Sequence, residues 1–177
     1  MDEVLVRLIY DFSEAGWVDQ LMIFFSSWGY KGMIVAFILM TFMKSTRKAG
    51  LAVIAGTVAG LIITRTIRYL MPRERPFVVI EDITALIPKE ASASFPSEQG
   101  LIAGGFIALF WVFGGSLRWL GVAIGLLVLV SRVYLGHHYV SDVVIGALIG
   151  SFLFFTINNI VSRDRRTNRE TKEILTL

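Results

Sequence analysis

Side chains that can bind and transfer phosphate stand at the ends of the most apolar segments of this sequence. Three arginines, two serines, a histidine and an aspartate make up the set: Arg68, Arg75, Arg132, Ser97, Ser131, His138 and Asp142. An arginine guanidinium can donate two parallel hydrogen bonds to phosphate oxygens. A neutral imidazole can attack phosphorus as a nucleophile. The set therefore indicates a site that holds a phosphate group while a histidine attacks it.

The strongest pair in this set is a histidine followed four residues later by an aspartate, His138 and Asp142. At that spacing the two side chains share one face of a helix, so the carboxylate can hold one imidazole nitrogen and leave the other free. A capping pair or two metal ligands would show the same spacing. Because the nearby arginines would repel a divalent cation, we expect no metal. His137 should point about 100° away around the helix, so we expect it to be structural or peripheral.

The remaining polar residues each have a plain alternative. Arg68 closes one apolar segment and could bind phosphate or only extend to the membrane interface, while Arg75 could be an ordinary loop charge. Ser97 follows Pro96 at the start of a further apolar segment. The free N–H groups of a helix start bind anions, although an ordinary helix cap looks the same in sequence.

Taken together, the motifs resemble those of the type-2 phosphatidic-acid phosphatase superfamily. Its members carry Lys-x6-Arg-Pro, then Pro-Ser-x-His, then Ser-Arg-x5-His-x3-Asp. This chain has corresponding residues between Arg68 and Asp142, and the third motif is complete. Residues 86–97 are most similar to the bacitracin-resistance type of undecaprenyl-diphosphatase.

The resemblance implies a role for each of these residues. His138 would be the nucleophile that forms a phosphohistidine, and Asp142 would orient it. The phosphate would be bound without a metal or other cofactor by Arg68, Arg75, Ser97 and Arg132.

Two positions depart from the superfamily pattern. Arg68 replaces the usual lysine and keeps the charge, whereas Gln99 stands where the second histidine, the presumed proton donor to the leaving group, is expected. Glutamine cannot supply a proton. A lipid monophosphate leaving group, with a pKa of roughly 6, can depart unprotonated. A lipid alcohol resembles water, with a pKa of roughly 15.7, and needs an acid.

Together with Gln99, the resemblance implies hydrolysis of undecaprenyl diphosphate to undecaprenyl phosphate and phosphate, which would recycle the carrier lipid for cell-wall peptidoglycan synthesis. Alternatives are a phosphatase for phosphatidylglycerol phosphate or phosphatidic acid. A lipid-phosphate binding protein, catalytically impaired by Gln99, is a further alternative.

The composition is that of a membrane protein. The 177 residues form one domain with 55% hydrophobic residues and a mean hydropathy of +0.67, far from the average of soluble domains. The net charge of +3 is scattered between apolar runs, which argues against nucleic-acid binding. The absence of cysteine excludes disulfides and thiolate zinc sites. The acidic start at residues 1–3 leads us to expect no cleavable signal peptide.

We expect an all-α integral membrane protein, a bundle of about five transmembrane helices plus an N-terminal amphipathic helix, six helices in all. Residues 4–14 alternate at helical spacing and predict a helix at the membrane surface, within an interfacial segment 1–16. Apolar runs predict the spans 18–43, with a break near Gly29, then 49–70, 100–113 with a start close to Ser97, 117–135 and 140–160. A polar loop, 71–95, and a basic tail, 163–177, complete the single domain 1–177.

The distribution of basic residues predicts the orientation. Lys44, Arg47, Lys48, Arg118 and the tail 163–177 all fall on one side of the expected bundle. The positive-inside rule places that side in the cytoplasm. We therefore expect a multi-pass protein of the bacterial plasma (inner) membrane with its site on the extracytoplasmic side. Its partners would be membrane lipids and a lipid phosphate or diphosphate substrate, with the oligomeric state left open.

Overall fold

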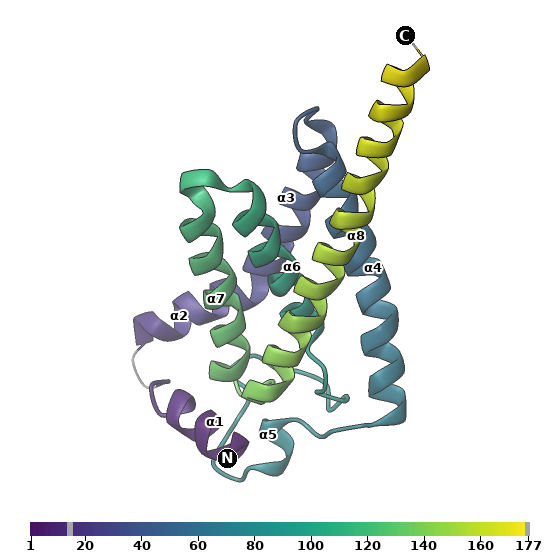
Figure 1. Cartoon of the computed structure of the whole chain (residues 1–177). Coiled ribbons are helices and arrows are strands. Elements are labelled where there is room, and N and C mark those ends of the chain that lie inside the picture. The colour runs from purple at the N-terminus through teal and green to yellow at the C-terminus, as the bar shows by residue number, and fades with distance from the viewer. Residues whose placement is uncertain (14–15, 176–177) are drawn as a thin grey trace.

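The fold is an all-helical bundle, as Figure 1 shows. The structure, a computed structural model, describes residues 1–13 and 16–175; for residues 163–175 only the backbone is described, so the side chains of the predicted basic tail lie outside it. Within the described residues no strand occurs. The elements are α1 (Asp2–Tyr10), α2 (Gly16–Phe24), a π-helical turn (Phe25–Gly29), α3 (Tyr30–Phe42), α4 (Arg47–Leu70), α5 (Pro76–Val79), α6 (Glu98–Phe113), a 3-10 turn (Gly115–Leu117), α7 (Arg118–Tyr134) and α8 (Val140–Leu175).

Among the described residues, four segments are long and apolar enough to cross a membrane: Gly16–Phe42, Arg47–Leu70, Gly115–Tyr134 and Val140–Ser162. The helix α6 is the shorter fifth apolar element. The prediction of a bundle of about five membrane helices is therefore confirmed. The expected break near Gly29 is present as the π-helical turn that separates α2 from α3.

The helix α6 lies at the centre of the bundle, in contact with α3, α4, α7 and α8. It starts at Glu98 with Ser97 as its cap, as expected from the short apolar run. The backbones of α6 and α8 are in close contact at Gly104. A Cβ atom added there would lie only 2.0 Å from the carbonyl oxygen of Ala147, which leaves room for glycine but not for a side chain. This close approach brings the starts of α6 and α8 together, where the N–H of Ser97 donates to the carbonyl oxygen of Asp142 at 3.0 Å.

The predicted N-terminal helix is present as α1, which ends at Tyr10 rather than at residue 14. Its Leu5 and Leu8 side chains are exposed, while Val6 is fully buried against the polar loop and the ends of α7 and α8. The helix is therefore amphipathic as expected, but its buried face packs against the protein itself.

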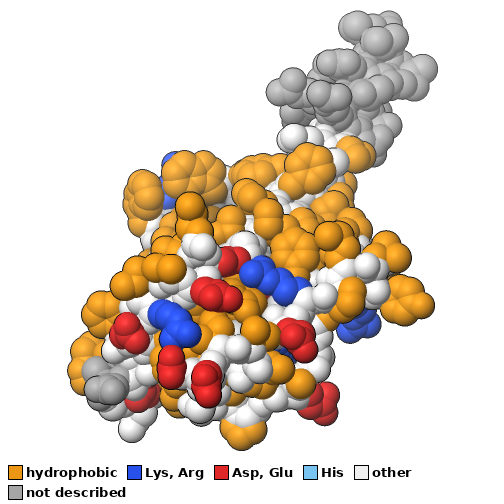
Figure 2. All heavy atoms as spheres, turned by 90° about the horizontal axis from the view of Figure 1, so that it is seen from below, with side chains coloured by type: hydrophobic (Ala, Val, Ile, Leu, Met, Phe, Trp, Pro, Cys, Tyr) orange, Lys and Arg blue, Asp and Glu red, His pale blue; other side chains and the backbone are white. Residues whose placement is uncertain are grey.

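The long connection between α4 and α6 runs across the end of the bundle at which α1 lies (Figure 1). It contains the short helix α5, which begins with Pro76 and has Arg75 as its preceding cap residue. Figure 2 looks onto this end and shows lysine, arginine, aspartate and glutamate side chains gathered on it, bordered by hydrophobic side chains.

Candidate active site

The residues expected to carry chemistry come from helix ends, from the turn before α8 and from the polar loop, all at this one end of the bundle. Helices that cross a membrane alternate in direction, so the end of α4, the start of α6, the end of α7 and the start of α8 lie on the same side. Most of the site is inaccessible to solvent. The exposed fractions are 2% for Arg75, 0% for Ser97, 3% for Arg132, 3% for His138 and 0% for Asp142.

The two nitrogens of the His138 imidazole have different surroundings: Nε2 has a hydrogen-bond partner, whereas Nδ1 has none among the described residues and lies near a carboxylate. Its Nε2 lies 3.2 Å from Nη1 of Arg75, and its Nδ1 lies 3.6 Å from Oδ2 of Asp142. A guanidinium can only donate, so Nε2 accepts and carries the lone pair, and the proton resides on Nδ1, which faces the carboxylate. The tautomer with a nucleophilic Nε2 is the one that this geometry selects.

One detail of the sequence prediction was wrong. His138 lies in the turn before α8, which begins at Val140, so the pair does not share a helical face. Asp142 reaches back instead from the first helical turn, and its Oδ2 accepts the backbone N–H of Tyr139 at 2.9 Å. The turn itself depends on Gly136, with a φ of 70°, a conformation that favours glycine.

The adjacent histidine has a different role, as expected. Nε2 of His137 lies 2.9 Å from the carbonyl oxygen of Ile87, and its ring packs edge-on against Phe77. These contacts join the turn before α8 to the polar loop. His137 therefore holds the loop in place and does not point toward Nε2 of His138.

The protonation states suit nucleophilic attack at neutral pH. Burial, and then the positive charges of Arg132 and Arg75, hold the pKa of His138 well below its ordinary value. Burial followed by Arg132 lowers the pKa of His137 to about 4. Both imidazoles are therefore neutral at neutral pH. Burial and then Arg68 lower the pKa of Arg75 to about 10, which leaves its guanidinium charged.

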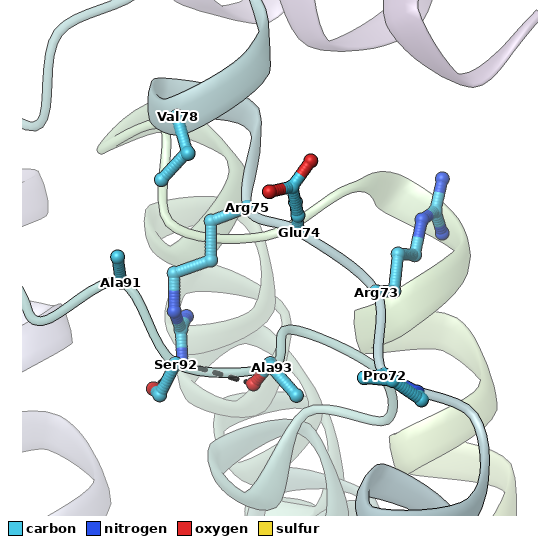
Figure 3. A pocket seen from close by; sticks show the side chains of 8 residues that line it. All are labelled: Pro72, Arg73, Glu74, Arg75, Val78, Ala91, Ser92 and Ala93. Atoms are coloured by element: carbon cyan, nitrogen blue, oxygen red, sulfur yellow. Dashed lines mark hydrogen bonds between the residues drawn. The ribbon is translucent and has the colours of Figure 1, made fainter.

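The loop arginine Arg75 connects the nucleophile to the polar loop. Its Nη1 donates to the carbonyl oxygen of His137 at 2.8 Å, and its Nη2 donates to Ser92 Oγ at 3.1 Å and to the Ala93 carbonyl oxygen at 3.3 Å. Figure 3 shows the side chain extending toward Ser92 and Ala93 at the edge of a cavity of about 290 Å³. The alternative that Arg75 is an ordinary loop charge does not fit its burial.

The arginine at the end of α4 turns toward the site. The Nε and Nη2 atoms of Arg68 donate to the carbonyl oxygen of Pro96 at 3.1 and 2.8 Å. Its Nη1 lies 3.3 Å from Oε1 of Glu98. Arg68 therefore contacts the start of α6 directly. It does more than extend to the membrane interface, which was the alternative interpretation.

The third arginine, Arg132, lies at the end of α7 and donates from Nη1 to the hydroxyl of Ser26 in the π-helical turn. Its Nε has no hydrogen-bond partner. Within the part of the chain whose side chains are described, no carboxylate lies within 4.0 Å of a nitrogen of Arg75 or Arg132. Buried charges are normally paired, so two buried guanidiniums without a carboxylate form a site prepared for an anion.

At the start of α6, Ser97 and Gln99 show what sequence alone left open. The hydroxyl oxygen of Ser97 accepts the backbone N–H of Gly100 at 3.1 Å, so this residue is a helix cap whether or not it also binds phosphate. Gln99 lies in the first turn of the helix, and its Oε1 is buried without a hydrogen-bond partner.

Sequence reasoning missed Arg73, which contacts the Asp142 carboxylate, and Asp2 and Ser141, which contact Arg73. Nη1 of Arg73 lies 2.8 Å from Oδ1 of Asp142. In the sequence, Arg73 reads as one more loop charge next to Glu74. Asp2 is separated from Ser141 by 139 positions, and no local pattern connects residues so far apart.

No group of three or more His, Asp or Glu side chains able to hold a metal ion occurs in the portion whose side chains are described. The metal-free, cofactor-free site remains a prediction that follows from the arginine cluster.

The fold and the site define an all-helical membrane protein with several arginines around a buried histidine. The chain belongs to the PAP2 superfamily, whose family model matches residues 49–166. It is 32% identical over 154 residues to the undecaprenyl-diphosphatase of Sulfolobus acidocaldarius, covering 85% of this chain and 74% of that protein. It is 34% identical over 152 residues to undecaprenyl-diphosphatase BcrC of Bacillus subtilis, covering 81% and 77%. The resemblance inferred from the motifs is thereby confirmed.

Two solved structures share the fold. The PAP2-type phosphatidylglycerolphosphate phosphatase of Bacillus subtilis has a TM-score of 0.71 at 24% identity, covering 92% of this chain and 85% of that one. LpxE of Aquifex aeolicus has a TM-score of 0.74 at 22% identity, covering 86% and 92%. Both similarities extend across most of the helical bundle.

Proposed function

We propose that this protein hydrolyses undecaprenyl diphosphate to undecaprenyl phosphate and inorganic phosphate through a phosphohistidine at His138. The observation that carries the proposal is a pair of buried guanidiniums, Arg75 and Arg132, with no carboxylate partner among the side chains that the structure describes. They lie beside a histidine whose Nε2 carries its lone pair. The relatives named undecaprenyl-diphosphatase support the choice of lipid. In a bacterial membrane the product would return to the carrier-lipid pool for cell-wall synthesis.

The reaction proceeds in two displacements. The terminal phosphate binds among Arg68, Arg75 and Arg132. It accepts the hydrogen bond that Nη1 of Arg75 donates to Nε2 of His138 in the structure, which frees the lone pair of Nε2. Nε2 of His138 then attacks phosphorus, and the bond to the bridging oxygen breaks, so that the lipid monophosphate leaves with that oxygen. Asp142 compensates the positive charge that develops on the imidazole. Water then attacks the phosphohistidine, releases inorganic phosphate and restores the ring.

The substitution at position 99 favours a diphosphate over a monoester. Gln99 cannot protonate a leaving group, but a lipid monophosphate has a pKa of roughly 6 and departs without a proton. General acid assistance contributes about 10²–10⁴-fold, and its loss falls mainly on substrates that expel an alcohol. The amide of Gln99 remains able to hydrogen-bond a phosphate oxygen.

An additional cation supports the same choice. Burial, and then the positive charges of Arg132 and Arg75, lower the pKa of Lys89. Its loop is joined to the site on both sides, since Ile87 contacts His137 and Ser92 accepts from Arg75. A diphosphate carries more negative charge than a monoester, which suits a site with this many cations.

The substrate is tested by phosphate release from the purified protein on four lipids side by side: undecaprenyl diphosphate, undecaprenyl phosphate, phosphatidylglycerol phosphate and phosphatidic acid. We expect the diphosphate to react at least about 100-fold faster than any monoester, because only its leaving group departs without an acid. A preference for a monoester would replace the proposed substrate. No release from any of the four would support the binding-protein alternative.

The protein spans the membrane several times, and we propose that the site faces the extracytoplasmic side. Lys44 lies between α3 and α4, and Arg47 and Lys48 are the first residues of α4, at the end remote from Arg68. Positive charges in short loops mark the cytoplasmic side. The polar loop and the site would then face outward in a bacterial plasma membrane.

Cysteine labelling tests this orientation, because the chain has no native cysteine. We expect Glu90→Cys, in the polar loop, to react with a membrane-impermeant maleimide in intact cells. Ser45→Cys, between α3 and α4, should react only after permeabilisation. Both positions are exposed in the structure, so access depends on the side of the membrane. Labelling of Ser45→Cys alone in intact cells would reverse the orientation.

A further inference from the structure

Arg73 is separated from Arg75 by one residue, yet the two side chains extend in different directions (Figure 3). The Nη1 atom of Arg73 donates to Ser141 Oγ at 2.7 Å and to Asp142 Oδ1 at 2.8 Å. Its Nη2 donates to Asp2 Oδ2 at 2.9 Å. The guanidinium carbon also lies 3.7 Å from the ring centroid of Tyr139. The group is therefore held by both terminal nitrogens and by one face.

These contacts leave Arg73 poorly suited to bind substrate. A phosphate ligand needs N–H groups directed at the anion, as Arg75 directs its Nη1 toward Nε2 of His138. Both terminal nitrogens of Arg73 instead point at carboxylates, with Nη1 on Asp142 and Nη2 on Asp2. Arg73 acts on the site through Asp142.

The two carboxylate oxygens of Asp142 have different contacts. Oδ2 accepts the Tyr139 N–H at 2.9 Å and faces Nδ1 of His138 at 3.6 Å. Oδ1 is bound by Arg73. Rotation of the carboxylate about its χ2 axis would break the bond to Arg73, so Arg73 keeps Oδ2 turned toward the imidazole. Because Asp142 is 0% exposed, the charge of Arg73 also offsets the cost of burying a carboxylate.

The N-terminal helix completes the arrangement. Oδ1 of Asp2 accepts the backbone N–H of Ser141 at 3.2 Å, and Oδ2 contacts the Ser141 hydroxyl as well as Arg73. Asp2 therefore caps the first turn of α8, where a negative charge is favoured by the helix dipole. The burial of Val6 anchors α1 in this position.

We propose that Arg73, anchored by Asp2 of the N-terminal helix, is a positioning residue that fixes the Asp142 carboxylate and thereby the tautomer of His138. This inference rests on the proposed nucleophilic role of His138, and it makes α1 a functional part of the site.

The kinetic test uses purified full-length variants and phosphate release from undecaprenyl diphosphate. Arg73→Gln should lower kcat by about 10–100-fold, the usual cost of losing a residue that orients a site ligand. KM should change less than about threefold, because the phosphate is not touched. Arg73→Lys should recover part of kcat, since one ammonium can still donate to Asp142. Arg7→Gln, an exposed arginine of α1 that pairs with Asp82, is the matched control and should leave kcat unchanged.

A double-mutant cycle separates positioning from general structural damage. In an Asp142→Asn background, adding Arg73→Gln should lower kcat by less than about a further threefold, because both changes remove the same interaction. Asp2→Asn should also lower kcat, but by less than Arg73→Gln. Glu3→Gln, a change at the exposed neighbouring residue, should leave kcat unchanged. A full additional loss in the Asp142→Asn background would overturn the proposal. So would a raised KM with unchanged kcat.

A second readout needs no substrate and therefore distinguishes failure of this inference from failure of the proposed function. The chain has two histidines, so His137→Gln leaves His138 as the single imidazole for ¹⁵N NMR. We expect the tautomer protonated at Nδ1 in this background and a mixture of tautomers after Arg73→Gln. If the ¹⁵N shifts do not change, Arg73 does not position His138, whichever lipid the wild-type protein cleaves.

Discussion

His138→Ala should abolish phosphate release, with a fall in kcat/KM of more than about 10⁴-fold on undecaprenyl diphosphate, because no other side chain can replace the nucleophile. Nε2 of His138 lies 3.2 Å from Nη1 of Arg75, beside the buried guanidiniums of Arg75 and Arg132. Phosphate release from the purified variant measures the effect. Trapping of protein-bound phosphate from a substrate labelled in its terminal phosphate reports the covalent intermediate directly.

The neighbouring histidine supplies the control. His137→Ala removes an imidazole that contacts the Ile87 carbonyl oxygen, so we expect a loss of less than about tenfold, typical of a group outside the reacting atoms. Trapped phosphate should persist in this variant and disappear in His138→Ala. Turnover that survives His138→Ala would exclude the phosphohistidine route, and activity that depends on an added divalent ion would favour a metal mechanism.

Gln99→His should change substrate selectivity more than any other single substitution in this chain. We expect hydrolysis of undecaprenyl phosphate and phosphatidic acid to rise about 10²–10⁴-fold, the usual contribution of a general acid. Hydrolysis of the diphosphate should rise less than about tenfold, because its leaving group, with a pKa of roughly 6, already departs without a proton. Initial rates on each lipid at equal surface concentration give the comparison.

Gln99→Asn is the matched control, since it keeps an amide and adds no acid; monoester hydrolysis should not rise. Equal gains on monoesters and diphosphate in Gln99→His would show that position 99 acts through binding or geometry. Strong activity on every lipid after the change, with none before it, would identify the wild-type chain as an impaired enzyme.

Much of the architecture follows from local patterns. Long apolar runs must satisfy their backbone polar groups within the bilayer, which forces helices. Successive spans alternate direction, so residues that flank α4, α6, α7 and α8 meet at one end of the bundle. For this reason Arg68, Arg132 and His138 could be grouped from sequence, although their mutual contacts could not.

The arrangement of atoms inside that group depends on tertiary structure. The spacing of His138 and Asp142 suggested one helical face, whereas Gly136 places the histidine in a turn and the aspartate in the helix after it. The lone pair on Nε2 follows from Arg75, which comes from a loop 63 positions away, together with Asp142 near Nδ1 on the other side of the ring. The hydrophobic periodicity of the sequence does not predict such contacts, because they depend on how the loop crosses the end of the bundle.

The class of protein follows from hydrophobic runs and short motifs in the sequence, and the same motifs mark the residues proposed to bind phosphate and the proposed nucleophile. The proposed role of Arg73 depends on the tertiary structure. It requires Asp2 of α1 and Asp142 of α8, 71 and 69 positions away, to approach one guanidinium. That approach depends on the burial of Val6 beside α8 and on glycine contacts that bring α6 against α8. Side chains so distant along the chain meet only where packing of the helices places them.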